Sequence, residues 1–154
     1  MTEVYRLVRA ARAADVLSGE GARIYGGRWN PRGAAVVYAS ESRALAVLET
    51  FVHLTLEARA MRFLLYAITL PKRFRLQRHV DKRRLRSPSR TREIGRTWLD
   101  DGDALALVVP SVIVPQETNY LLNVRHPQFT QLQVQKPEPF SFDERLWRSR
   151  GVWA

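Results

Sequence analysis

The fold of this chain is organised by residues 26–49, which read Gly-Gly-Arg-Trp-Asn-Pro-Arg-Gly-Ala-Ala-Val-Val-Tyr-Ala-Ser-Glu-Ser-Arg-Ala-Leu-Ala-Val-Leu-Glu. The paired glycines can adopt backbone conformations closed to other residues, and the Asn-Pro-Arg-Gly that follows is typical of a turn. The apolar run at 34–39, which contains Tyr38, has the length of an interior strand. Ser40 is a suitable helix N-cap and Glu41 suits a first helical turn. The stretch therefore predicts a glycine turn, a short buried strand and a helix.

The helix predicted at 41–56 carries a carboxylate on its apolar face. The buried side is marked by apolar residues at helical spacing, namely Leu45, Leu48, Val52 and Leu56. Glu49 lies on the same side, where an ionised carboxylate is costly unless it is paired or hydrogen-bonded. Two interpretations stay open. Glu49 lies at the edge of the apolar stripe, where it reaches solvent or pairs with Arg28, or it is a catalytic or substrate-positioning group.

Length and composition are those of one globular domain spanning residues 1–154, of which 45% are hydrophobic. The sequence contains no apolar run long enough to cross a membrane, and its start lacks the apolar region of a signal peptide. Cysteine is absent, which excludes disulfides and thiolate chemistry. These features favour a cytoplasmic protein.

The chain is strongly basic, with a formal charge of +10 and a sequence pI near 11.0. Such a surface suits nucleic acid, a phosphorylated metabolite or an acidic protein partner. Thirteen cations lie in one region: Arg59, Arg62, Lys72, Arg73, Arg75, Arg78, Lys82, Arg83, Arg84, Arg86, Arg90, Arg92 and Arg96. Their simplest interpretation is a solvated surface.

Patterns along the rest of the chain predict strands at 4–8, 62–70, 74–77, 104–109, 112–114, 132–134 and 140–142. Helices or helical turns are expected at 10–14, 89–99 and 143–147. Loops are expected at 18–22 and 82–88, and a brief ordered segment at 119–123. Strands interrupted by two helices predict an α+β domain with a mixed central sheet and flanking helices.

Searches for standard chemical motifs leave two features. The histidines, His53, His79 and His126, have no metal-ligand spacing, and no metal site is predicted. Arg28 follows flexible backbone, from which a guanidinium can bind a pyrophosphate through two hydrogen bonds. Ser111 interrupts an apolar run after a proline. It is either satisfied by backbone at a bulge or aims its hydroxyl into a cleft.

Several blocks together resemble the RES domain, a family named for its Arg, Glu and Ser. The resemblance covers roughly residues 5–139, and Val124 stands where the family pattern would place a proline. The blocks are Gly26-Gly27-Arg28-Trp29-Asn30, Tyr38-Ala39-Ser40, the helix ending at Glu49, Pro110-Ser111, Glu117-Thr118-Asn119-Tyr120-Leu121-Leu122-Asn123 and His126-Pro127.

The resemblance implies a fold related to ADP-ribosyltransferases and a toxin of a bacterial toxin–antitoxin pair that consumes NAD. Its partner would be an Xre-like helix-turn-helix antitoxin. The implied catalytic residues are Arg28, Tyr38, Glu49 and Ser111. We add Gly27, Trp29, Asn30 and Asn123 as expected substrate-binding residues, with no metal. Direct nucleic-acid binding is not expected outside the antitoxin complex, and homo-oligomer formation is left open.

The implied residues suit cleavage of the nicotinamide–ribose bond. A carboxylate stabilises an oxocarbenium-like transition state, and an arginine holds the pyrophosphate. A tyrosine offers an aromatic face to nicotinamide, while a serine can hydrogen-bond the carboxamide or ribose. Nicotinamide is already a good leaving group, so the reaction needs no metal. Water, phosphate and protein all stay open as acceptors.

The competing function is a basic nucleic-acid-binding protein or a small ribonuclease toxin. It is motivated by the charge and the interleaved aromatic residues. A ribonuclease would need a constellation of His, Lys or Glu that this sequence does not assemble.

Overall fold

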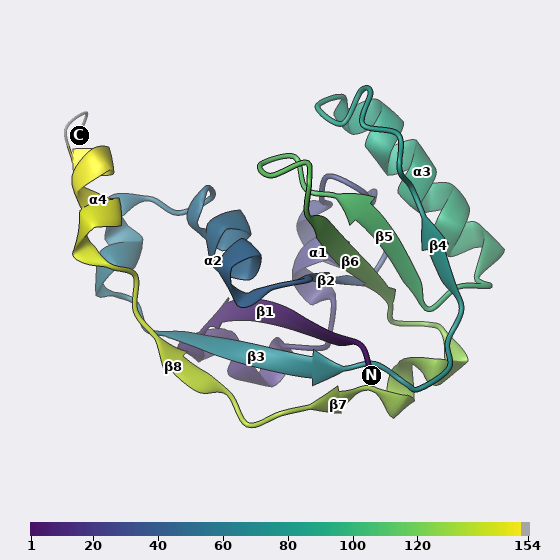
Figure 1. Cartoon of the computed structure of the whole chain (residues 1–154), viewed down its shortest axis with the longest axis horizontal. Coiled ribbons are helices and arrows are strands. Elements are labelled where there is room, and N and C mark those ends of the chain that lie inside the picture. The colour runs from purple at the N-terminus through teal and green to yellow at the C-terminus, as the bar shows by residue number, and fades with distance from the viewer. Residues whose placement is uncertain (152–154) are drawn as a thin grey trace.

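A mixed sheet forms the centre of the molecule, and side chains alternate between its two faces along each strand. The computed structural model describes residues 1–151. The strands are β1 (Glu3–Arg9), β2 (Val36–Ser40), β3 (Phe63–Thr69), β4 (Leu76–Arg78), β5 (Ala106–Pro110), β6 (Thr118–Asn123), β7 (Gln133–Val134) and β8 (Glu138–Phe140). Their order is β4-β5-β6-β2-β1-β3-β7, with β8 also paired to β3 (Figure 1). Because β4 and β5 run parallel and the other pairs antiparallel, the predicted mixed sheet is confirmed.

The sheet is almost divided between β1 and β2. Within the described residues these strands share one pair, Tyr5 with Ser40, whereas β1 and β3 pair along their whole length. Arg6 reaches across the division, and its Nη1 donates a hydrogen bond of 2.7 Å to the carbonyl of Tyr38. Burial lowers the pKa of Arg6 to about 10, so the guanidinium still carries its charge at neutral pH.

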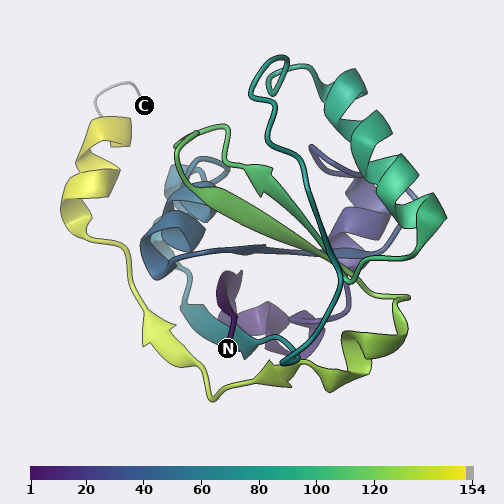
Figure 2. The ribbon, with the colours of Figure 1, turned by 45° about the vertical axis from the view of Figure 1, so that its right-hand side comes forward.

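Helices lie around this divided sheet. They are α1 (Glu20–Tyr25), α2 (Arg43–Phe51), α3 (Pro88–Asp101) and α4 (Glu144–Gly151), with 3-10 turns η1 (Ala10–Asp15), η2 (Leu56–Ala60) and η3 (Pro127–Gln131). Figures 1 and 2 show α3 beside β4 and β5, and α2 over the region where β1 and β2 separate. The C-terminal α4 contacts η2 at the other end of the sheet. No helix in the described part of the chain is long and apolar enough to cross a membrane.

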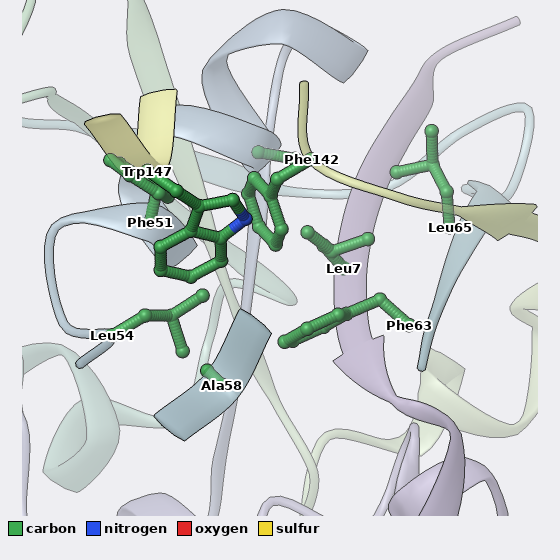
Figure 3. Close-up of a cluster of buried hydrophobic side chains, with 9 residues drawn as sticks. Leu7, Phe51, Leu54, Ala58, Phe63, Leu65, Phe142 and Trp147 are labelled. Atoms are coloured by element: carbon green, nitrogen blue, oxygen red, sulfur yellow. The ribbon is translucent and has the colours of Figure 1, made fainter. Parts of the chain in front are cut away.

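The core beneath α2 and α3 consists of two separate clusters. One lies under α3 and contains Trp98 and Leu107. The other lies between α2, α4, β1 and β3 and is rich in aromatic rings, with Phe142 packed between Phe51 and Phe63 (Figure 3). A third cluster fills the opposite face of the sheet. The division of the sheet is therefore matched by a division of the core above it.

The central helix differs from its prediction at both ends. Ser42, not Ser40, is the N-cap, and its Oγ accepts a hydrogen bond from the backbone N–H of Leu45. Ser40 is instead the last residue of β2. The helix ends at Phe51, and Val52, expected to be buried, is 44% exposed. Leu56 begins the separate turn η2.

Other elements also begin or end at residues that differ from the predicted ones. The loop expected at 18–22 includes the start of α1, and residues 112–114 form a turn instead of a continued strand. The segment 119–123 belongs to the central strand β6. The late strands shift by a few residues, and the expected helical turn at 143–147 is α4. All thirteen cations between residues 59 and 96 are exposed, as the solvated-surface interpretation expects.

Candidate active site

A cavity of about 680 Å³ opens between the two core clusters, a size typical of small-molecule sites. One wall has apolar residues of the aromatic cluster, including Leu7 and Leu54. The other wall has residues of the α3 cluster, including Trp29 and Tyr38. The strands β1 and β2 supply residues where they diverge. The cavity is thus a consequence of the divided sheet.

Glu49 projects from α2 into the wall of this cavity and is held by two hydrogen bonds. The Ser111 hydroxyl and the Asn119 side-chain amide both donate to its Oε1, each at 2.7 Å. Among residues 1–151, neither Glu49 nor Arg28 takes part in an ion pair. The structure therefore does not contain the Glu49–Arg28 ion pair that the sequence left open. The Arg28 Nη1 instead donates to the carbonyl of Leu85 at 3.0 Å.

Ser111 acts on Glu49 from outside the cavity lining. It is fully buried, and its Oγ accepts hydrogen bonds from the backbone N–H groups of Ile113 and Val114. Its one hydroxyl hydrogen goes to Glu49. The backbone N–H groups after β5 bond the Ser111 oxygen, as the structural interpretation of Ser111 expected. Its hydroxyl hydrogen bonds a carboxylate of the cavity wall, which is part of the functional interpretation. The expected contact with substrate would require it to release one of these partners.

Tyr38 fixes the glycine turn to the sheet. Its hydroxyl donates to Asn30 Oδ1 at 2.6 Å and accepts from the backbone N–H of Trp29 at 3.2 Å. Burial raises the pKa of Tyr38 above its ordinary value, so the hydroxyl stays neutral at physiological pH. A Cβ on Gly27 would lie 2.7 Å from this hydroxyl and from Asn30 Oδ1. The absence of a side chain at Gly27 lets the turn close over Tyr38.

Of the expected substrate-binding residues, Gly27 and Trp29 line the cavity. Asn30 is fully buried, and its amide donates to the carbonyls of Ala22 and Pro31. Its hydrogen bonds therefore hold the glycine turn to α1. Asn123 lies at the other end of β6, where its Oδ1 accepts from the N–H of Arg125, and it does not line the cavity.

Helix α3 supports the turn from the other side. The Thr91 hydroxyl donates to the Arg28 carbonyl, and Arg92 Nε donates to the Gly27 carbonyl at 3.0 Å. Gly95 lies against the Trp29 carbonyl, so closely that a Cβ there would be 1.5 Å from its oxygen. Sequence reasoning missed these contacts. The one available signal was a glycine in the middle of a predicted helix.

The charges that line the cavity are mostly positive. Within residues 1–151, Glu49 is the one carboxylate of the lining. Four arginines also line the cavity: Arg6, Arg9, Arg28 and Arg92. Such a lining favours an anionic ligand. His53 also lines the cavity, but residues 1–151 contain no group of three or more His, Asp or Glu that could hold a metal ion.

The sequence model of the RES domain matches residues 3–143. The chain belongs to the RES domain family. The resemblance inferred from the glycine turn, Tyr38, Glu49 and Ser111 is thereby confirmed.

RES relatives match this chain over nearly its full length. One from Yersinia enterocolitica, named Toxin Res, is 40% identical over 93% of this chain and 98% of its own. A Toxin Res of Pseudomonas putida is 39% identical over 92% and 99% of the two chains. A relative from a Sphingobium species, named Prs ADP-ribosylating toxin, is 38% identical over 96% and 98%.

A solved structure shares the fold. It is the M. tuberculosis MbcT–MbcA toxin–antitoxin complex, one chain of which matches with a TM-score of 0.72 and 19% identity. The match covers 97% of this chain and 88% of that one. It confirms the single-domain α+β fold with a mixed central sheet that the sequence predicted.

Proposed function

We propose that this RES protein is the toxin of a bacterial toxin–antitoxin pair and that it cleaves the nicotinamide–ribose bond of NAD. The observation that carries the proposal is the placement of Glu49, a carboxylate oriented by Ser111 and Asn119 at the wall of a cavity whose other charged lining residues are arginines. The names of the relatives, which include toxins and one ADP-ribosylating toxin, support the same reading.

The proposed reaction uses the charges of the cavity in two ways. Arg28, aided by other arginines of the lining, holds the pyrophosphate dianion of NAD. As the bond from ribose C1′ to the nicotinamide nitrogen breaks, its electron pair leaves with neutral nicotinamide and positive charge develops on the ribose. Glu49 stabilises that charge in the transition state. The acceptor then bonds to C1′; water or a protein hydroxyl releases its proton to solvent, whereas the phosphate dianion attacks through an unprotonated oxygen.

Tyr38 and Ser111 support this chemistry by position. Tyr38 offers its ring to the cavity while its hydroxyl holds the turn that carries Arg28. Ser111 fixes Glu49. Water, phosphate and a protein side chain all remain acceptors for the proposed reaction.

The direct test is incubation of the purified protein with NAD, with release of free nicotinamide as the measurement. Parallel reactions contain water alone, inorganic phosphate or candidate protein acceptors, and a separate reaction contains RNA. Phosphate-stimulated release would identify phosphorolysis, and labelled protein would identify ADP-ribosyl transfer. Intact NAD in every reaction, together with cleaved RNA, would replace the proposal with the ribonuclease alternative.

Arg28→Lys should lose most of the activity, because lysine keeps the charge but not the planar pair of donors. Loss of a charge-assisted hydrogen bond costs about 1.5–3 kcal/mol, so kcat/KM should fall about 10- to 100-fold. The matched control is Arg96→Lys, an exposed position on α3 outside the cavity lining. An Arg28→Lys protein with full kcat/KM would show that two-point binding by Arg28 is not used.

The proposed toxin also requires a partner that restrains it. An Xre-like antitoxin whose acidic segment covers the cavity mouth would complement the arginines there. Expression of this chain alone should stop bacterial growth, and co-expression of the protein encoded beside it should restore growth. Normal growth with abundant active protein and no partner would contradict this expectation.

A further inference from the structure

Asn119 connects two polar side chains at the cavity wall. The Ser40 hydroxyl donates to Asn119 Oδ1 at 2.7 Å, and Asn119 Nδ2 donates to Glu49 Oε1 at 2.7 Å. An ionised carboxylate can only accept, so Glu49 requires that the amide nitrogen face it. Ser40 fixes the same orientation of the Asn119 amide, because its hydroxyl donates to the amide oxygen.

One oxygen of Glu49 and one amide hydrogen of Asn119 are left without a hydrogen-bond partner in residues 1–151. Ser111 and Asn119 both bind Oε1 of Glu49, and in residues 1–151 no hydrogen bond reaches Oε2. The second hydrogen of Asn119 Nδ2 likewise has no partner within those residues. Asn119 and Glu49 are both half-buried, and both line the cavity. The pair therefore presents one donor and one charged acceptor side by side.

We propose that Asn119 is a positioning residue that holds Glu49 with one amide hydrogen and binds the substrate with the other. This inference rests on the proposed NAD cleavage. The substrate atom would be an oxygen of the nicotinamide riboside half, which Asn119 binds while Oε2 of Glu49 faces the developing positive charge. Ser40 acts through Asn119 by keeping the amide from rotating.

This arrangement predicts a specific pattern in steady-state kinetics of nicotinamide release. Asn119→Ala removes both amide contacts, so kcat should fall about 10- to 100-fold and KM should rise. Ser40→Ala leaves both Asn119 donors in place but frees the amide to rotate. Its kcat should fall about threefold to tenfold, with a smaller change in KM. Because Ser40 acts through Asn119, its loss should add nothing in the double variant.

Two further variants separate positioning from packing. Asn119→Asp keeps the shape of the side chain and its bond from Ser40, but replaces the donor with a second negative group. It should be as inactive as Asn119→Ala even in protein whose melting curve shows that the fold is retained. Thr118→Ala is the matched control, because Thr118 lies next to Asn119 on β6 and its side chain bonds Glu41, with both residues outside the cavity lining. Circular dichroism and melting curves establish that each variant is folded.

The possible results separate the role of Asn119 from the proposed cleavage of NAD. Wild-type protein that releases no nicotinamide with any acceptor overturns the proposed function and this inference together. Active wild type with kcat and KM within about twofold in both Asn119 variants overturns only the role of Asn119. Independent, additive losses from Ser40→Ala and Asn119→Ala overturn the claim that Ser40 acts through Asn119.

Discussion

Replacing Glu49 with glutamine should leave a folded protein that no longer cleaves NAD. Glutamine keeps the side-chain size, and its carbonyl oxygen can accept the hydrogen bonds from Ser111 and Asn119. The missing charge matters when the ribose becomes positive, so kcat should fall about 10²- to 10⁴-fold while NAD binding changes little. Single-turnover release of nicotinamide and calorimetric binding of NAD measure the two effects separately.

The melting temperature gives the second half of this test. If Glu49 compensated a buried arginine, its neutralisation would cost roughly 3–5 kcal/mol. The structure pairs Glu49 with neutral donors instead, so the melting temperature should stay close to that of the parent. Glu57→Gln is a suitable control because Glu57 is exposed on η2 and lies outside the cavity lining. An active Glu49→Gln protein that melts early would make the residue structural.

Gly95→Ala should have the largest effect on stability. The added Cβ would lie 1.5 Å from the Trp29 carbonyl oxygen and 2.7 Å from its carbon, and backbone cannot move aside as a flexible side chain can. Helix α3 must then shift away from the glycine turn. Such overpacking costs about 3 kcal/mol or more, which corresponds to a melting temperature lower by about 6–12 °C.

The same substitution should also reduce activity, because Thr91 and Arg92 on α3 hold the carbonyls of Arg28 and Gly27. Gly21→Ala is the matched control. A Cβ at Gly21 meets no atom within 4 Å, and this exposed position in α1 should gain up to about 1 kcal/mol. A Gly95→Ala protein as stable as the parent would show that α3 and the turn can separate without loss.

The local parts of the fold were accessible from sequence. Residues 26–49 predicted the turn, the buried strand and the helix because each depends on neighbouring residues. Glu49 was conspicuous because its charge conflicted with the apolar face of its own helix. Local patterns could not show its hydrogen-bond partners, since Ser111 and Asn119 follow it by 62 and 70 residues. The RES resemblance placed Ser111 in the same site but did not assign Asn119 to it.

The errors have the same physical origin. Val112 and its apolar neighbours looked like a strand, but the Ser111 hydroxyl captures the N–H groups of Ile113 and Val114 and turns the chain. The strand β6 was not predicted, because its ends are polar. One of these polar residues, Asn119, lines a cavity that local sequence does not reveal. Gly95 could not be explained without the Trp29 backbone, which lies far from it in sequence.

Within residues 1–151, backbone pairing between the two halves of the sheet is limited to the single pair joining β1 to β2. The halves are held together by the Tyr5–Ser40 pair, by the Arg6 bond to Tyr38 and by the cluster on the opposite face, which contains residues of both. Tyr38, Ser111 and Asn119 all belong to the half that contains β2, β5 and β6. Strand pairing thus holds Tyr38 and Asn119 at fixed positions relative to each other, and Glu49 on α2 is tied to this half through its bonds to Ser111 and Asn119.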